Sequence, residues 1–126
     1  MEEGELLIAG VGNLGCTWAK AAHKRVSEWA DLTLVDADDK SMEGVRNANC
    51  LLLGDSPSKV GCAGMPELAE SRMRTLQPIA SHFLERAELV LLLTGLGGGS
   101  GSGASIEFAR QAVQSGCLVL TVAAMP

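Results

Sequence analysis

The amino-acid sequence predicts an α/β fold: a doubly wound, open parallel sheet of the Rossmann-like kind, with about five strands and with helices on both faces. Two observations support this prediction. Short segments that are apolar on both faces alternate with segments in which apolar residues recur at helical spacing. A glycine-rich turn also follows two of the apolar segments directly. With right-handed crossovers, this order of elements gives the strand order 3-2-1-4-5.

Each expected element follows from a local pattern. Strands are predicted where the short apolar runs stand, at residues 5–9, 32–35, 50–53, 89–93 and 118–122. Between the first two strands, one apolar stripe predicts a helix with both tryptophans in the core: Leu14, Trp18, Ala21, Ala22, Val26 and Trp29. A short helix fits residues 39–48.

Two prolines and one glycine mark the remaining helices. Pro66 suits the first turn of a helix, and Pro78 should kink or split that helix before Arg86. The last helix is predicted over residues 104–115, and Gly116 suits its end. Its inward stripe is expected to be Ile106, Ala109, Ala112 and Val113.

Composition limits the class of protein. The 126 residues are expected to form a single domain, residues 1–126. No segment approaches the ~18 consecutive apolar residues of a membrane span, and the first five residues are acidic where a signal peptide is basic. We therefore expect a soluble, cytoplasmic protein. A net charge of −5 and an aromatic content of 3% argue against nucleic-acid binding. The cysteines form no Cys-x-x-Cys pair, so they are expected to be reduced, buried thiols and not metal ligands.

One glycine-rich run lies between a predicted strand and a predicted helix. Residues 97–103 read Gly-Gly-Gly-Ser-Gly-Ser-Gly. Glycine backbone and a helix N-terminus together can direct several N–H groups at one phosphate, and Ser100 and Ser102 add hydroxyl groups. The alternative is a flexible Gly/Ser linker. A linker is rarely held between a buried strand and an amphipathic helix, so the run favours phosphate binding.

A second glycine motif stands near the start of the chain. Gly10-Val11-Gly12-Asn13-Leu14-Gly15 has the spacing GxGxxG between a predicted strand and a predicted helix, and Asp36 ends the next strand. Taken alone, this pattern indicates an NAD-type dinucleotide site in which Asp36 accepts a hydrogen bond from the ribose. In the expected strand order, strands one and four are neighbours. Both glycine loops should therefore face one ligand.

The run at residues 97–103 resembles the signature motif of the tubulin/FtsZ family. The resemblance extends to the start of the first loop, to Asp38 after the second strand, and to a third loop, Gly61-Cys62-Ala63-Gly64-Met65-Pro66-Glu67. Residues 8–38 are also similar to the opening of ubiquitin-activating-type adenylating enzymes, in which Asp38 would lie near ATP. That similarity does not account for residues 97–103.

The tubulin/FtsZ resemblance implies a cytoskeletal or cell-division GTPase that binds GTP or GDP, with or without Mg²⁺. Two departures concern the base. Thr17 stands where many family members have an Asn that helps to read guanine, and Asp36 stands where the family has Asn. Carried over residue by residue, the nucleotide contacts would be Gly10, Gly12, Asn13, Leu14, Thr17, Asp36, Asp38, Gly61, Ala63, Gly64, Pro66, Glu67, Gly97, Gly98, Gly99, Ser100, Gly101 and Ser102.

No catalytic residue is assigned from the sequence. Asp38 and Glu67 are the carboxylates nearest the expected crevice, where either could order a Mg²⁺-bound water. The resemblance implies that the family's central helix, and the loop whose carboxylate completes a neighbouring subunit's site, would follow Pro126. We therefore expect nucleotide binding with negligible hydrolysis by this chain alone.

Two alternative functions and one assembly surface remain open. The first alternative is an NAD-binding domain that uses Gly10, Gly12, Gly15 and Asp36. The second is a degenerate assembly module that has kept the fold and lost the ligand. The apolar last strand is expected to offer its edge to a second copy of the chain or to a longer-chain partner.

Overall fold

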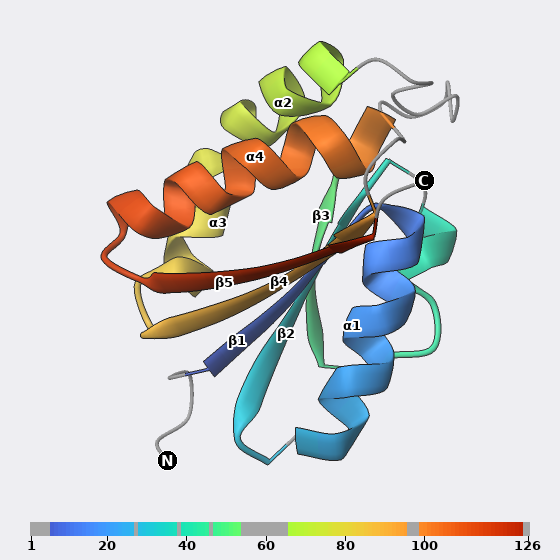
Figure 1. Ribbon diagram of the computed structural model, residues 1–126, viewed down its shortest axis with the longest axis vertical. Helices are drawn as coiled ribbons and strands as arrows, with labels where there is room; N and C mark the ends of the chain where they lie inside the picture. Colours follow the sequence, from blue (N-terminus) through green and yellow to red (C-terminus); the bar gives the residue numbers. More distant parts are fainter. Residues whose placement is uncertain are drawn as a thin grey trace.

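The computed structural model describes residues 6–26, 28–37, 39–45, 47–53, 66–95 and 99–124 of the chain. Within these residues, five parallel strands form one sheet in the order β3-β2-β1-β4-β5 (Figure 1). The strands are β1 (Leu6–Val11), β2 (Ala30–Asp36), β3 (Ala48–Leu52), β4 (Leu89–Gly95) and β5 (Leu118–Ala124). The helices are α1 (Gly12–Val26), α2 (Pro66–Thr75), α3 (Gln77–Leu84) and α4 (Gly99–Gln114), with a 3-10 turn η1 (Asp39–Met42). The predicted fold class and strand order are confirmed.

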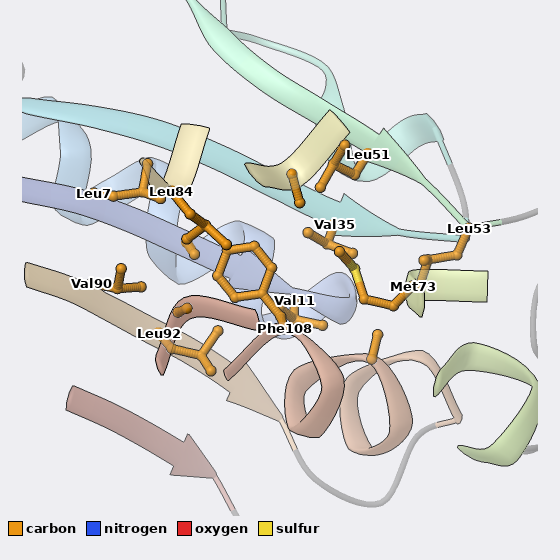
Figure 2. Close-up of a cluster of buried hydrophobic side chains, with 14 of the residues drawn as sticks. Leu7, Val11, Val35, Leu51, Leu53, Met73, Leu84, Val90, Leu92 and Phe108 are labelled. Carbon is orange, nitrogen blue, oxygen red and sulfur yellow. The ribbon is translucent and has the colours of Figure 1, made fainter. Parts of the chain in front are cut away.

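Helices cover both faces of the sheet. α1 lies on one face, and α2, α3 and α4 lie on the other (Figure 1). Under α1, Ile8, Leu32 and Leu34 pack against Cys16 and Ala19 of the helix. On the opposite face, the Phe108 ring of α4 is 1% exposed and lies within a larger cluster (Figure 2). The other labelled members of that cluster are Leu7, Val11, Val35, Leu51, Leu53, Met73, Leu84, Val90 and Leu92.

The edge strand β5 is the least covered strand. It pairs with β4 along its whole length, from Leu118 opposite Leu89 to Ala124 opposite Gly95. α1 packs on β1, β2 and β4 and leaves most of β5 uncovered. The exposed apolar side chains of β5 are Leu118, Leu120 and Val122, with exposed fractions of 72%, 58% and 47%.

Proline and glycine end helices where the sequence predicts. α2 begins at Pro66. Pro78 lacks an N–H group and cannot continue that helix, so α2 ends and α3 begins before it. Gly116 follows α4 with φ of 91° and donates its N–H to the Val113 carbonyl at 3.0 Å. This left-handed conformation is the usual glycine end of a helix.

The predicted inward face of α1 is wrong in part. Leu14 and Trp29 are 43% and 55% exposed, so neither belongs to the core. The buried residues of α1 are all small: Gly12, Gly15, Cys16 and Ala19. Small side chains let the helix backbone lie close to the sheet. Trp18, Ala22 and Val26 are partly buried and pack against the cluster under α1, as predicted, whereas Trp29 lies beyond the end of the helix.

The predicted inward face of α4 is also wrong in part. Ile106 and Val113 are 66% and 62% exposed, whereas Phe108 and two polar residues, Glu107 and Gln111, are buried. This face is decided by contact with α2 and the sheet. The helix begins at Gly99, inside the glycine run and earlier than the predicted residue 104.

Two smaller expectations also fail. Within residues 39–45, which the structure describes, the only helical segment is the short turn η1, because Gly44 has φ of 85° and breaks the helical path. Cys16 and Cys117 are buried free thiols, but Cys50 is exposed because β3 is an edge strand. Among the described residues, no helix has the length and apolar character needed to cross a bilayer.

Candidate functional site

The first glycine loop meets three steric requirements. Gly12 has φ of 79°, a backbone conformation that residues with side chains rarely adopt. A Cβ atom at Gly10 would lie 2.5 Å from the Gly15 carbonyl oxygen and 2.7 Å from the Ala19 Cβ. A Cβ atom at Gly15 would overlap the carbonyl oxygen of Leu93 on β4. The three glycines therefore allow α1 to begin directly against the sheet.

This packing joins the first loop to the strand that precedes the second glycine run. β1 and β4 are neighbours, with Gly10 paired to Leu93. At the end of β4, a Cβ atom at Gly95 would lie 3.2 Å from Cδ2 of Leu14. The start of α1 and the end of β4 thus lie side by side at the carboxyl edge of the sheet. This is the neighbourhood predicted for strands one and four.

The second glycine run continues into α4. The helix begins at Gly99, so its first turn consists of glycine and serine, as residues 99–102. Neither this turn nor the first turn of α1 contains an acidic residue. No carboxylate from either turn therefore compensates the free N–H groups and the positive dipole end of its helix. Both helices begin at the same edge of the sheet (Figure 1), an arrangement that suits an anion.

Three predicted contacts lie on the first turns of α1. Asn13, Leu14 and Thr17 are all exposed. The Thr17 hydroxyl donates a hydrogen bond to the Asn13 carbonyl oxygen at 3.0 Å. Its oxygen lone pairs remain able to accept a hydrogen bond, but its hydrogen is already used. Thr17 therefore presents an acceptor to the exposed side of the helix.

Asp36 has a different environment from the other predicted contacts. Its side chain is 5% exposed. Its Oδ1 accepts the Ala37 N–H at 2.7 Å, and its Oδ2 accepts the hydroxyl of Ser41 in η1. The Asp36 carbonyl oxygen also accepts the Leu53 N–H at 2.8 Å. The carboxylate thus orders the turn after β2. Because both of its oxygens already accept hydrogen bonds within the chain, its environment does not favour the role of ribose acceptor that the NAD interpretation requires.

The Cys16 thiol lies behind the first loop. Its Sγ atom is 3.5 Å from the Gly10 carbonyl oxygen and 3.6 Å from that of Val35. Burial, and after it the nearby charge of Asp36, raises the pKa of this thiol to about 12. Cys16 is therefore a protonated donor to the backbone and is not a nucleophile at neutral pH.

α2 is held from two sides. The Arg72 guanidinium donates to the carbonyl oxygen of Leu53, directly after β3, at 2.8 Å. From the other side, the Gln111 side-chain amide of α4 donates to the Met73 carbonyl oxygen at 3.2 Å. These contacts fix the helix that begins at Pro66, and its start lies at the same end of the molecule as the start of α4 (Figure 1).

The sequence pattern does not predict the polar contacts between α2 and α4. Glu107 is a charged residue with 1% exposure, which no periodicity indicates. Only the spacing of Glu107 and Arg110, three residues apart on one helix, indicates an ion pair. The contacts to α2 have no signal in the sequence, because their partners lie more than 30 residues away.

Several predicted contacts are not tested by the structure. Outside the described residues lie Asp38, Gly61, Ala63, Gly64, Gly97 and Gly98. The structure describes only the backbone, within α2 and α4, for Pro66, Glu67, Gly99, Ser100, Gly101 and Ser102. In the part of the chain that the structure describes, no group of three or more His, Cys, Asp or Glu residues could hold a metal ion.

Comparison with known proteins assigns the chain to a family. The model of the Tubulin/FtsZ family, GTPase domain, matches residues 5–126. The chain is 26% identical over 120 residues to cell division protein FtsZ 1 of Archaeoglobus fulgidus, covering 94% of this chain and 33% of that protein. It is also 26% identical over 125 residues to FtsZ 1 of Thermococcus kodakarensis, covering 98% and 34%. The chain thus spans about a third of the length of these relatives.

Solved structures show the same fold. An FtsZ dimer from M. jannaschii superposes with a TM-score of 0.82 at 18% identity, covering 97% of this chain and 36% of that one. CetZ2 from Haloferax volcanii, in a GTPγS-bound protofilament, superposes with a TM-score of 0.77 at 23% identity, covering 94% and 39%. Because the model of the GTPase domain matches nearly all of the chain, this protein belongs to the Tubulin/FtsZ family.

Proposed function

We propose that this chain binds a purine nucleotide, GTP or GDP, with the phosphates at the carboxyl edge of the sheet between β1 and β4. One observation carries the proposal: α1 begins directly against the end of β4, the strand that leads toward residues 97–103. The two predicted phosphate loops therefore start from adjacent points. Family membership supports the same ligand, and one structural neighbour was solved with GTPγS.

The described residues fit a polyphosphate. Gly12 takes the left-handed conformation that lets consecutive N–H groups converge. The first turns of α1 and α4 contain no carboxylate that would repel an anion. In this proposal, the first turns of α1 and α4, together with residues 97–102, hold the phosphates. Mg²⁺, when bound with the nucleotide, would neutralise phosphate charge.

Recognition of the base is proposed to be weak. Thr17 replaces the Asn expected from the family resemblance, and its hydroxyl hydrogen is bonded to Asn13. Most of the binding free energy would then come from the phosphates. We expect the affinities for GTP and ATP to differ by less than roughly 100-fold, which corresponds to about 2.8 kcal/mol of base recognition.

The test is to identify the nucleotide released from the purified protein, and then to measure thermal stabilisation by GTP, GDP, ATP and NAD. The variant Gly98→Val should lose GTP binding, whereas Gln114→Val, exposed at the far end of α4, should not. Unchanged GTP affinity in a folded Gly98→Val variant would remove the main support for the proposal. Exclusive NAD binding, lost in Asp36→Ala, would establish the dinucleotide alternative. No stabilisation by any nucleotide would indicate a degenerate assembly module.

We further propose that the chain alone hydrolyses GTP negligibly and forms no head-to-tail filaments. It spans about a third of the length of its FtsZ relatives, and no catalytic residue is assigned among its own residues. Phosphoryl transfer depends on positioned groups, and loss of one such group costs on the order of 10³ to 10⁵ in rate. Phosphate release that rises with protein concentration, together with filaments that pellet only with GTP, would contradict this proposal.

Finally, we propose that β5 pairs with β5 of a second copy. The strand carries no charge and no proline, and α1 leaves its apolar side chains exposed. An antiparallel pair centred on Thr121 would place Leu120 opposite Val122 and Thr121 opposite itself, which makes the strand complementary to its own copy. Sedimentation should show a dimer that Leu120→Lys dissociates. A parent protein that stays monomeric from dilute to concentrated solution would refute this pairing.

A further inference from the structure

A buried polar cluster lies between α2 and α4. Its centre is the Glu107 carboxylate of α4, which is 1% exposed. The Arg110 guanidinium donates to both carboxylate oxygens, through Nε at 2.8 Å and Nη2 at 2.6 Å. The Gln111 amide donates to Glu107 Oε2 at 2.8 Å. The charge of Glu107 is therefore compensated within its own helix.

The same cluster reaches across to α2. The Gln111 amide also donates to the Met73 carbonyl oxygen at 3.2 Å, and Arg74 Nε lies 3.7 Å from Glu107 Oε1. Arg74 is oriented in turn by Glu70, at 2.8 Å on the same helix. Two consecutive residues of α2 thus contact two residues of α4, through one hydrogen bond and one longer ion pair.

Directional contacts set the axial register between the helices. Apolar side chains can slide past one another with little change in buried area, but a buried carboxylate or amide that loses its partner is costly. Each residue adds 1.5 Å along a helix, so a one-residue slip would break the Gln111–Met73 hydrogen bond and change the distance between Glu107 and Arg74. Register matters here because α2 and α4 both begin at the carboxyl edge of the sheet (Figure 1).

We propose that Glu107 and Gln111 are positioning residues for nucleotide binding. They hold α2 in register on α4, so that the start of α2, where Glu67 is expected to order a Mg²⁺-bound water, stays beside the phosphates held at the starts of α1 and α4. Arg72, which donates to the Leu53 carbonyl, supports α2 from the opposite side. This inference rests on the nucleotide function proposed above, and it adds residues that lie outside the glycine loops.

The inference predicts an effect that depends on phosphate number. In this inference a nucleoside monophosphate contacts only the starts of α1 and α4, whereas a triphosphate with its Mg²⁺ also reaches the start of α2. Calorimetry on the whole chain should therefore show weaker GTP binding in Glu107→Gln and Gln111→Met, by about 3- to 30-fold, with GMP affinity nearly unchanged. A purely structural role would lower the unfolding midpoint and leave the ratio of GTP to GMP affinity as in the parent.

Gln114→Met is the matched control. It makes the same substitution as Gln111→Met at an exposed position near the end of the same helix, so the affinity ratio should not change. Arg74→Gln removes the ion pair to Glu107 from an exposed residue of α2 and serves if the buried variants do not fold. An unchanged ratio in every folded variant of Glu107, Gln111 and Arg74, or an equal change in Gln114→Met, overturns this inference alone. A parent protein that binds no nucleotide overturns the proposed function and this inference with it.

Discussion

Replacement of Gly15 by alanine tests whether the close contact between α1 and β4 is required. Gly15 lies within α1, where alanine is the better helix former by about 1 kcal/mol. Helix propensity alone therefore predicts a more stable protein. The packing predicts the opposite, because the new Cβ would overlap the Leu93 carbonyl oxygen and lie 3.0 Å from the Thr94 Cα.

The size of the loss follows from what must move. Both contacted atoms belong to the backbone of β4, which is held between β1 and β5, so no side-chain rotation can relieve the contact. Overpacking of this kind costs up to about 3 kcal/mol. After subtraction of the helix-propensity gain, Gly15→Ala should destabilise the fold by about 2 kcal/mol. For a domain of this size, the melting temperature should fall by about 6 to 10 °C.

Urea unfolding measures this change, and Gly95→Ala provides a control at the same contact. A Cβ atom at Gly95 would meet only the Leu14 side chain, at 3.2 Å. Leu14 is 43% exposed, so its Cδ2 can rotate away and its Cβ, at 3.3 Å, needs to shift only slightly; Gly95→Ala should therefore change stability by less than about 1 kcal/mol. A Gly15→Ala protein at least as stable as the parent, or equal losses in the two variants, would refute the steric argument.

Three further predictions concern buried polar groups. Ser41→Ala removes a hydroxyl donor from the buried Asp36 carboxylate and should lower the free energy of unfolding, measured in urea, by about 1 to 3 kcal/mol. An unchanged free energy of unfolding would show that this hydrogen bond does not contribute to stability. Alkylation of the native protein at pH 8, resolved by site with mass spectrometry, should modify Cys50 before Cys16, because burial raises the pKa of the Cys16 thiol to about 12; equal rates would contradict this. A hydrogen-bonded guanidinium lowers the pKa of Glu107, so the carboxylate contributes stability above its ordinary pKa of 4.5 that is lost as the pH falls below it. Glu107→Gln should therefore flatten the acid side of the stability curve, and an unchanged curve would exclude this contribution.

Much of the fold could be predicted from local patterns in the sequence. Apolar runs marked the five strands, Pro78 marked the break between α2 and α3, and Gly116 marked the end of α4. Each of these signals acts through a few neighbouring residues, either by fixing φ or by removing a hydrogen-bond donor. The alternation of strands and helices was then sufficient for the strand order, since right-handed crossovers leave few arrangements.

The tertiary structure decided which helix faces are buried and which polar groups meet. The sequence places Trp29 on the apolar stripe of α1, but the helix ends at Val26, so Trp29 lies beyond it and is exposed. Asp36 has the position of a ribose ligand in the sequence, whereas its carboxylate binds the turn that contains Ser41. Glu107 is buried because groups on α2 and α4 satisfy it together. Burial depends on partners that are distant along the chain, and a periodic pattern reports only the residues of its own segment.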